Sequence, residues 1–461
     1  MIITHLHFKI YSFIIDTQNY LFRNLFSESI KQAVGGIEMS TLGIISEYNP
    51  YHNGHAYLLE SAKEMTGSAH AVSIMSGPFS QQGLPMVQDK YVRAAAAAAS
   101  GIDLVFELPV LFATGSAGDF AEGAVALLTR SHLVDTLCFG VETPDESLFS
   151  EAADCILEEP DPYKDALRQL QKEGLSYPSA REKALTLVLG QKIHDLVGKP
   201  NNILALEYIL AIRRLRSPLK ICMIRRTTDY HGAVSDLSSP FIHLSATEIR
   251  KKLLDQTPAD VTKSNIPSCL RDGLPEEALN AFQKAGLHFL LSPAGLMPYL
   301  AMRMLELPDE LPPDSLPMGM TQEMYHRLKK LSPPMEYEEA IEALKRKNIT
   351  RSRITRSLLH LILDIWESDR IRDLMHAPLY LNLLSAREES TGLLRTPADT
   401  EDTLPVITKK ASWHPTDHRT IRLWSLDLKA ELLYNQIFYD TCRVRNKPAY
   451  CRSPVIVPTK N

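Results

Sequence analysis

The sequence predicts an α/β fold, in which a doubly wound parallel sheet is followed by a mainly α-helical carboxyl-terminal domain. Short apolar runs alternate with segments of helical periodicity from residue 42 onward. The first run, residues 42–45, has the length and composition of a central parallel strand. Near residue 290 the alternation stops, and helical patterning with proline-rich joints at 312–313 and 333–334 takes over.

The predicted elements follow one another along the chain. Apolar runs with the length of buried strands lie at residues 42–45, 71–75, 103–108, 134–139 and 219–224. Helical patterns separate them, at about 54–65, 93–99, 121–128 and 151–198. The last of these is broken at Tyr177 and Pro178, and we expect it to form a helical insertion that covers the ligand site.

Length and charge narrow the possible classes. A chain of 461 residues exceeds one ordinary core, so two or three domains are expected. A net charge of −5 argues against indiscriminate nucleic-acid binding but allows a local basic face. Its 6 cysteines form no Cys-x-x-Cys pair, which favours reduced thiols in a cytoplasmic protein. No apolar run approaches the roughly 20 residues of a membrane-spanning helix, so no membrane partner is expected.

The chain is expected to divide into residues 1–38, 39–290 and 291–461. Residues 1–38 are crowded with Ile, Phe, Tyr, Asn and Lys and show no clean period. We interpret them as a spurious or non-native extension translated from upstream sequence, with Met39 as the natural start. A genuine extension or a targeting peptide is the alternative, although the segment lacks a compact apolar core and a small-residue cleavage site.

Two histidines, His52 and His55, follow the first predicted strand in the pattern His-x-Gly-His. They lie where a helix begins, and the unpaired N–H groups and dipole of a helix start favour a phosphate. Imidazoles in this position can stabilise the charge that develops when a nucleotide is attacked at its α-phosphate. Gly54 would let backbone and phosphate approach closely. Two nearby histidines are more often surface residues, but the position between strand and helix favours catalysis.

The stretch 47–55, Glu-Tyr-Asn-Pro-Tyr-His-Asn-Gly-His, resembles the signature of the tRNA(Met) cytidine acetate ligases, a branch of the HxGH nucleotidyltransferase superfamily. The similarity runs from about residue 41 to near the carboxyl end. It implies a Rossmann-like nucleotidyltransferase domain over 39–290 and a tRNA-binding domain over 291–461. It also implies that ATP, with Mg2+, activates acetate to acetyl-adenylate, and that the acetyl group passes to the wobble cytidine of elongator tRNA(Met) to give N4-acetylcytidine.

The same resemblance implies an ATP site and no protein-held metal. Its residues would be Ile45, Ser46, Glu47, Tyr48, Asn49, Gly54, His55, Gly140, Asn202, Arg226, Ser245, Thr247 and Arg250. Local interpretations exist for some of them. Asn202 could simply cap the helix that begins near Pro200, and Ser245 with Glu248 forms a capping box. A capped helix start is also an anion site, so both interpretations of Ser245 can hold.

The loop 76–85 is too long and polar for a minimal connection, which favours a functional role over a surface excursion. The loop departs from the family pattern at three positions. Gln82 stands where the family usually has arginine, Leu84 where it has glutamate, and Pro78 where it has asparagine. The acid could therefore be held differently or be a slightly different small acid. Lys90 and Arg93 share a helix face and could neutralise that acid or the triphosphate, or belong to an ordinary solvated face.

A basic stretch at 345–356 contains no acidic residue. Ile354, Leu358 and Leu359 predict a helix with one buried side and outward cations, which repel one another by a few tenths of a kcal/mol for each pair within a turn. Uncompensated charge of this kind suits a phosphate backbone better than a merely solvated face. The predicted tRNA-binding residues are Lys345, Arg346, Lys347, Arg351, Arg353 and Arg356.

Two other functions fit parts of the sequence. A small-molecule or carrier ligase or adenylyltransferase of the same superfamily would not need the basic helical half. A noncatalytic RNA-binding protein would not need intact His52, His55 and Arg250. The sequence leaves open the acid's identity, the tRNA identity elements and the oligomeric state.

Overall fold

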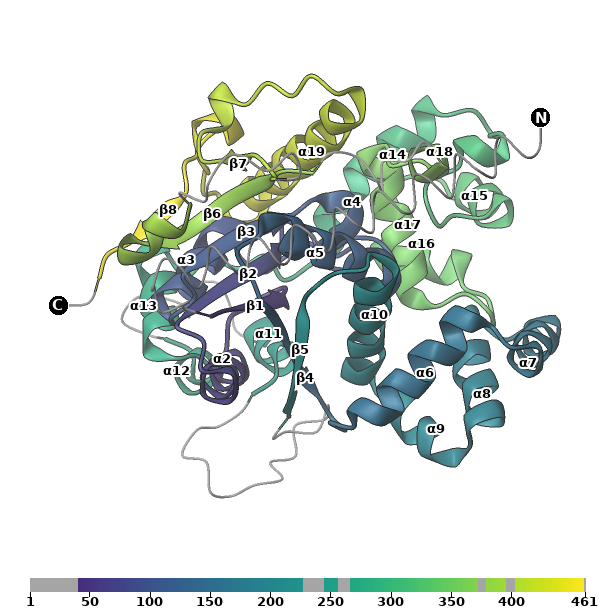
Figure 1. Ribbon diagram of the computed structural model, residues 1–461. Coiled ribbons are helices and arrows are strands. Elements are labelled where there is room, and N and C mark those ends of the chain that lie inside the picture. The colour runs from purple at the N-terminus through teal and green to yellow at the C-terminus, as the bar shows by residue number, and fades with distance from the viewer. Residues whose placement is uncertain (1–39, 227–243, 256–265, 372–378, 395–402, 460–461) are drawn as a thin grey trace, which may run out of the picture. The chain divides into compact units, whose positions relative to one another are not determined.

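The computed structural model describes residues 40–226, 244–255, 266–371, 379–394 and 403–459. The interpretation of residues 1–38 therefore concerns a segment outside the described residues. Residues 41–461 form one compact unit, to which everything below belongs. Its centre is an 8-stranded sheet with the strand order β5-β4-β1-β2-β3-β6-β7, and β8 also pairs with β6 (Figure 1).

The parallel part of the sheet confirms the predicted strands. It consists of β1 (Thr41–Ser46), β2 (His70–Ser76), β3 (Leu104–Leu108), β4 (Thr136–Val141) and β5 (Lys220–Arg225). Gly43 of β1 lies opposite both Val72 and Leu137. From β1 the chain adds β2 and β3 on one side of β1, and it then adds β4 and β5 on the other side of β1. This reversal leaves a crevice at the carboxyl ends of β1 and β4.

Two helical layers cover the parallel strands. Side chains alternate between the faces, so that Ala71 and Met75 join one core cluster while Val72 and Ile74 join the other. The first face packs against α2 (Asn53–Thr66), α3 (Lys90–Ala99), α11 (Ala246–Leu254), α12 (Ser268–Gly273) and α13 (Glu276–Ala285). The second packs against α4 (Val110–Ala113), α5 (Ala117–Ser131), α10 (Pro200–Arg214) and α19 (His418–Cys442).

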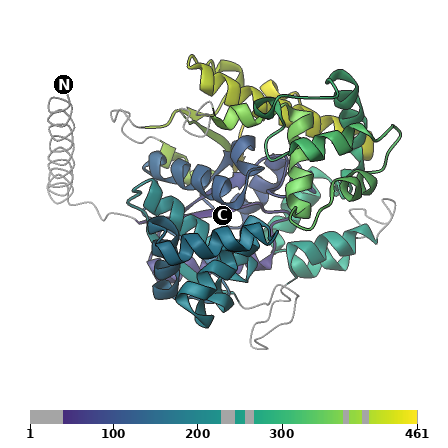
Figure 2. The ribbon, with the colours of Figure 1, turned by 90° about the vertical axis from the view of Figure 1, so that its right-hand side faces the viewer.

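The predicted helical insertion is present between β4 and α10. It comprises α6 (Glu146–Glu158), α7 (Asp161–Lys172), α8 (Tyr177–Leu189) and α9 (Gln191–Val197). The break at Tyr177 and Pro178 is the start of α8, where proline fits the first helical turn. These helices lie together in both views (Figures 1 and 2), and α6 and α9 pack on α10.

The second half of the chain is mainly helical, as predicted. Its helices are α14 (Met297–Glu306), α15 (Gln322–Lys329), α16 (Tyr337–Leu344), α17 (Arg351–Leu363), α18 (Glu367–Ile371) and α19. Short 3-10 helices lie at η1 (Pro293–Leu296), η2 (Pro313–Ser315), η4 (Glu388–Leu394), η5 (Lys410–Ser412) and η6 (Ala449–Cys451). Among the described residues, no helix is both long enough and apolar enough to cross a membrane.

The sequence did not predict that this half also extends the sheet. Strand β6 (Leu381–Arg387) pairs antiparallel with β3, and β7 (Val406–Ile407) and β8 (Val455–Val457) pair with β6. Strands from both sides of residue 290 therefore belong to one sheet. The miss has a physical cause, because the leucine-rich run 379–384 is interrupted only by Asn382, and the periodicity of so short an apolar run cannot distinguish a buried strand from a buried helix.

Candidate active site

A cavity of about 590 Å3 lies where the strand order reverses. It is bordered by the ends of β1 and β4, the first turns of α2 and α10, and the start of α11. Its size lies in the range of small-molecule sites. Predicted residues that line it are Ile45, Ser46, Glu47, Tyr48, Asn49, His55, Gly140, Arg226 and Arg250.

The turn between β1 and α2 is held by its own side chains. Tyr48 has a left-handed backbone, with φ of 47°, and its buried hydroxyl accepts a hydrogen bond of 3.1 Å from Ser73 Oγ on β2. Asn49 Oδ1 accepts a hydrogen bond of 2.9 Å from Val87 N. An uncommon backbone conformation persists only where its surroundings fix it, so this turn is a preorganised part of the cavity wall.

His52 and His55 form a reciprocal cap at the start of α2. His52 Nδ1 accepts from Gly54 N at 3.0 Å, and His55 Nδ1 accepts from His52 N at 3.2 Å. A nitrogen that accepts carries no proton, so the neutral form of each ring holds its proton on Nε2. The backbone therefore selects the tautomer that presents Nε2–H. The ring centroids are 3.9 Å apart, and His55 Nε2 lies 3.3 Å from Ser46 Oγ.

Burial sets the charge of this group. It holds the pKa of His55 well below the ordinary 6.5, and the electrostatic interactions of His55 with His52 and Arg226 lower this pKa further. His55 is therefore neutral at pH 7 and acts as a hydrogen-bond donor. Burial also raises the pKa of Glu47, whose Oε1 accepts from Gln81 N at 2.7 Å. The fixed positive charge at the cavity comes from Arg226 and Arg250.

Helix α11 is joined to the β1–α2 turn by Arg250. Its Nη1 donates to Asn49 O at 2.7 Å and its Nη2 to Thr247 Oγ1 at 3.0 Å. The capping box predicted at Ser245 and Glu248 is confirmed, with Glu248 N donating to Ser245 Oγ at 3.2 Å. The helix start that faces the cavity is therefore fixed in place.

Most of the chain matches known proteins. The family model of the HIGH Nucleotidyl Transferase covers residues 39–448. The tRNA(Met) cytidine acetate ligase of Thermoanaerobacter sp. (strain X514) is 33% identical over 400 residues, which are 86% of this chain and 95% of that protein. That of Clostridium perfringens (strain SM101 / Type A) is 32% identical over 427 residues, 91% and 100% respectively. The chain belongs to the tRNA(Met) cytidine acetate ligase family.

A solved structure of the same family supports the fold. The crystal structure of Thermotoga maritima TmcAL bound with alpha-thio ATP has a TM-score of 0.76 to this chain at 28% identity. The similarity covers 91% of this chain and 100% of that one. The Rossmann-like nucleotidyltransferase fold implied by the motif is therefore confirmed.

One predicted site residue of this family member has a different local role. Lys199 is the N-cap of α10, so the expectation that Asn202 caps this helix is wrong. Pro200 starts the helix earlier, which places Asn202 inside the first turn, fully buried, with Oδ1 accepting from Glu142 N at 2.9 Å. The Glu142 carboxylate in turn accepts from Asn202 N at 3.1 Å and from Asn201 Nδ2 at 2.6 Å. Asn201, not Asn202, lines the cavity.

Other predicted residues support the cavity from behind. His52, Gly54, Ser245 and Thr247 are not among the described residues that line it. A Cβ at Gly54 would lie 2.9 Å from the His52 ring, so glycine here leaves room for the capping imidazole. The cavity also takes no lining residue from 151–198, so the predicted insertion is not part of its wall. The reason is that α6 and α9 pack on α10, whose own first turn forms the wall.

Lys90 and Arg93 do not belong to a solvated helix face, because both are buried, and neither lines the cavity. Arg93 is fully buried and donates to backbone carbonyls, with Nη1 to Glu47 O at 2.5 Å and Nη2 to Ser76 O at 3.1 Å. It thereby ties the ends of β1 and β2 together. Lys90 is buried between Glu107, at 2.7 Å, and Glu431 of α19, at 2.8 Å. Charges buried without substrate require such partners.

The basic stretch 345–356 forms a helix only from Arg351 onward, and acidic side chains compensate part of its charge. Residues 345–350 connect α16 to α17, and α17 begins at Arg351. Acidic side chains distant in sequence pair with the cations, as Glu338 does with Arg351 at 2.5 Å and Glu323 with Arg346 at 3.2 Å. Lys345 pairs with Glu342 at 3.0 Å. The buried side is confirmed, because Ile354, Leu358 and Leu359 are buried.

Sequence reasoning missed several lining residues. Those from near segments are Leu58, Gln81, Gln82, Ala117, Phe120, Phe139, Pro200, Asn201, Ile203, Leu204, Tyr208 and Ala246, of which the two glutamines lie in the polar loop that the sequence had marked as functional. Ser352 of α17 also lines the cavity, and no local pattern indicates it. Gly83 explains why α17 can approach the loop so closely. The φ of Gly83 is +73°, and a Cβ on this residue would lie 2.8 Å from Arg356 Cα. Glycine thus allows the loop to touch α17 closely.

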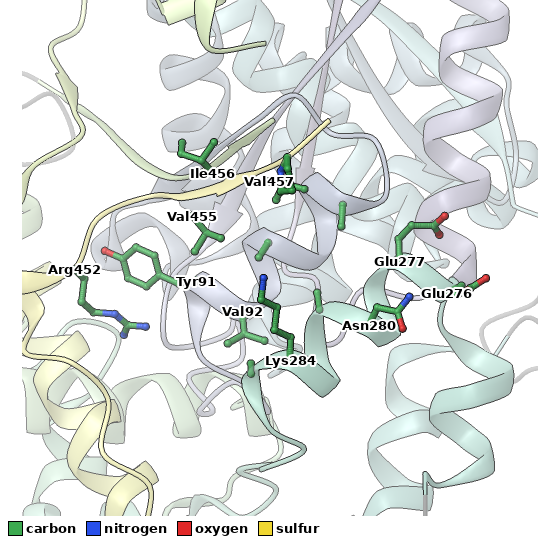
Figure 3. A pocket seen from close by; sticks show the side chains of 15 residues that line it. Tyr91, Val92, Glu276, Glu277, Asn280, Lys284, Arg452, Val455, Ile456 and Val457 are labelled. Atoms are coloured by element: carbon green, nitrogen blue, oxygen red, sulfur yellow. The ribbon is translucent and has the colours of Figure 1, made fainter. Parts of the chain in front are cut away.

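A separate cavity of about 660 Å3 lies between α3, α13 and β8. Figure 3 shows Val455, Ile456 and Val457 of β8 across from Asn280 and Lys284 of α13. Its described lining contains neither motif histidine. The chemistry-bearing groups converge on the smaller cavity at the strand reversal, which is therefore the candidate active site.

Proposed function

We propose that the chain is an ATP-dependent ligase that forms acetyl-adenylate from acetate and ATP and acetylates the wobble cytidine of elongator tRNA(Met), giving N4-acetylcytidine. The observation that carries the proposal is the imidazole of His55, whose tautomer presents Nε2–H in the same cavity as Arg226 and Arg250, and whose ring is capped reciprocally with His52. Family membership supports it, since the curated relatives bear this activity in their names. The cytoplasmic location expected from the sequence suits a tRNA substrate.

The first step joins the acid to the nucleotide. A carboxylate oxygen attacks the α-phosphorus of ATP, one P–O bond forms, and the bond to the bridging oxygen of the leaving pyrophosphate breaks. The Nε2–H groups stabilise the charge that builds on the phosphate oxygens, and the arginines hold the triphosphate. Holding acid and ATP in one site makes the attack effectively intramolecular. No proton is transferred in this step, which agrees with a neutral His55 and a Glu47 of raised pKa.

The second step transfers the acetyl group. The exocyclic amine of cytidine attacks the carbonyl carbon of the mixed anhydride, the C–O bond to phosphate breaks, AMP leaves, and the amine loses one proton to water. Helix α17 brings the proposed RNA-binding arginines to this site, because Ser352 lines the cavity and Arg356 Nη1 lies within 3.5 Å of Gln81 O. Nucleotide activation and RNA binding then meet at one wall.

Magnesium fits this site as an ion that the phosphates of ATP coordinate. The described residues contain no cluster of three or more His, Cys, Asp or Glu side chains that could hold a metal ion. Mg2+ is commonly bound through substrate phosphates and water with few protein ligands. When bound, it would neutralise part of the triphosphate charge, and we assign no side chain to it.

Product analysis tests the proposal. The protein is incubated with ATP, magnesium, labelled acetate and elongator tRNA(Met). Label should enter the tRNA as N4-acetylcytidine, with AMP and pyrophosphate released in equal amounts. A transcript with uridine at the wobble position lacks the amine and should accept nothing. Formation of ADP, or equal labelling of the uridine transcript, would contradict the proposed function.

A further inference from the structure

A small chamber of about 100 Å3 adjoins the proposed nucleotide cavity. The two share Glu47, Asn49, Gln82 and Arg250 as lining residues. The remaining lining residues are Leu84, Pro85, Val87, Leu290, Leu291 and Pro293, together with Ser80 and Ser292. The side chains that the chamber shares with the nucleotide cavity are therefore polar, whereas most of its other lining residues have apolar side chains.

The chamber lies at the end of the nucleotide cavity away from β4. The nucleotide cavity takes Phe139 and Gly140 from β4, and Gln81 and Gln82 from the loop that follows β2. The chamber takes no residue from β4 and is lined by Gln82 and further residues of that loop. Its far wall is fixed to that loop, because Leu290 N donates to Val87 O at 2.8 Å. A group in the chamber would thus meet the nucleotide across the β1–α2 turn, where His55 lies.

Hydrogen bonds within the loop fix the position of Leu84 in this wall. Leu84 O accepts from Ser80 N at 2.8 Å, and Gly83 N donates to Ser80 O at 2.8 Å. The turn is further held by Glu47, whose carboxylate accepts from Gln81 N, and by α17, whose backbone lies against Gly83. Side chains on such a turn can select a ligand by size, because the wall cannot easily move away.

We propose that this chamber holds the acyl group of the carboxylate substrate, with its carboxylate toward Arg250 and Gln82 and its aliphatic end against Leu84, Leu290 and Leu291. The inference rests on the proposed function and locates its second substrate. The volume suits a short unbranched monocarboxylate, and the apolar end disfavours an acid with a second charge, which would be buried without a partner. Gln82 and Leu84, two positions that depart from the family pattern, both border the chamber. They set the acyl preference of this chain.

Substitution of Leu84 tests the assignment through acid-dependent ATP–pyrophosphate exchange, measured with acetate, propionate and butyrate. Leu84→Ala enlarges the chamber and should raise the ratio of kcat/KM for propionate over acetate by about 10-fold or more, the scale of one methylene in an apolar pocket. Leu84→Phe fills it and should raise the KM for acetate by about 10-fold or more while the KM for ATP stays unchanged. Leu291→Ala, on the facing wall, should shift the ratio in the same direction as Leu84→Ala.

Ile456→Ala is the matched control, because Ile456 is an apolar side chain of the separate cavity in Figure 3. It should leave every acid ratio unchanged. Wild-type exchange with acetate, combined with unaltered ratios in Leu84→Ala and Leu291→Ala and an unaltered acetate KM in Leu84→Phe, would overturn the chamber assignment and leave the proposed function standing. Absence of exchange with every acid in the folded wild-type protein would overturn both.

Discussion

Thr355 Oγ1 of α17 donates a hydrogen bond to the carbonyl oxygen of Gln82, in the loop that borders both the nucleotide cavity and the acyl chamber. The two residues are separated by 273 positions in the sequence. The helix proposed to bind RNA is therefore attached directly to the loop proposed to bind the acid. A change on either side of this contact should be felt on the other.

Removing a motif imidazole should abolish most of the first reaction step. His52→Ala and His55→Ala should each lower ATP–pyrophosphate exchange by about 100-fold, the scale of losing one transition-state donor. His52→Asn is the control, because asparagine still caps a helix but lacks the imidazole. It should stay folded and be as impaired as His52→Ala. Exchange near the wild-type rate in a folded His55→Ala protein would remove the catalytic role.

Exposed cations should carry RNA binding without affecting adenylate formation. Lys345, Lys347 and Arg351 are exposed, whereas Arg353 and Arg356 are half-buried and contact Gly319 and Gln81. Replacing the exposed three with alanine should weaken tRNA binding and flatten its salt dependence, since fewer counterions are released. Lys172→Ala, an exposed lysine of α7, is the control and should bind normally. Parallel loss of exchange would contradict this division of roles.

The contact between Gly83 and α17 should be sensitive to one added methyl group. Gly83→Ala combines a positive φ with a Cβ 2.8 Å from Arg356 Cα, and should destabilise the fold by more than about 1 kcal/mol. Gly174→Ala is matched, because φ there is +85° and nothing lies within 4 Å of the added Cβ. Thermal unfolding should therefore show the larger loss of Tm for Gly83→Ala. Equal losses would mean that only the backbone conformation matters.

Acid should destabilise the fold through His360. Burial holds its pKa at about 4, with Nδ1 2.8 Å from Met318 O and Nε2 3.0 Å from Thr114 Oγ1. Between this value and the ordinary 6.5 the unfolded chain binds more protons than the folded one, so stability falls as the pH decreases through that window. The expected loss is about 2 kcal/mol at pH 5. His360→Gln should unfold with a smaller pH dependence, and an unchanged one would refute this account.

The features that the sequence predicted are local. The five parallel strands and the start of α2 at the His-x-Gly-His motif follow from short apolar runs and from the helical spacing after Gly54. The features it missed join distant residues. Glu338 compensates Arg351 from another helix, β6 extends the sheet beyond β3, and Ser352 reaches the nucleotide cavity from α17. No periodicity or short motif encodes such contacts, because each depends on how the folded elements pack.

The buried ion pairs of Lys90 also determine when folding can be completed during synthesis of the chain. Lys90 lies in α3, yet one of its carboxylate partners, Glu431, belongs to α19 near the end of the chain. Until that helix leaves the ribosome, part of the charge on Lys90 is unmatched. A product truncated before residue 418 would contain every motif residue and strands β1 to β7, and would still lack Glu431 and β8. Such fragments should be recovered as aggregates or degraded chains.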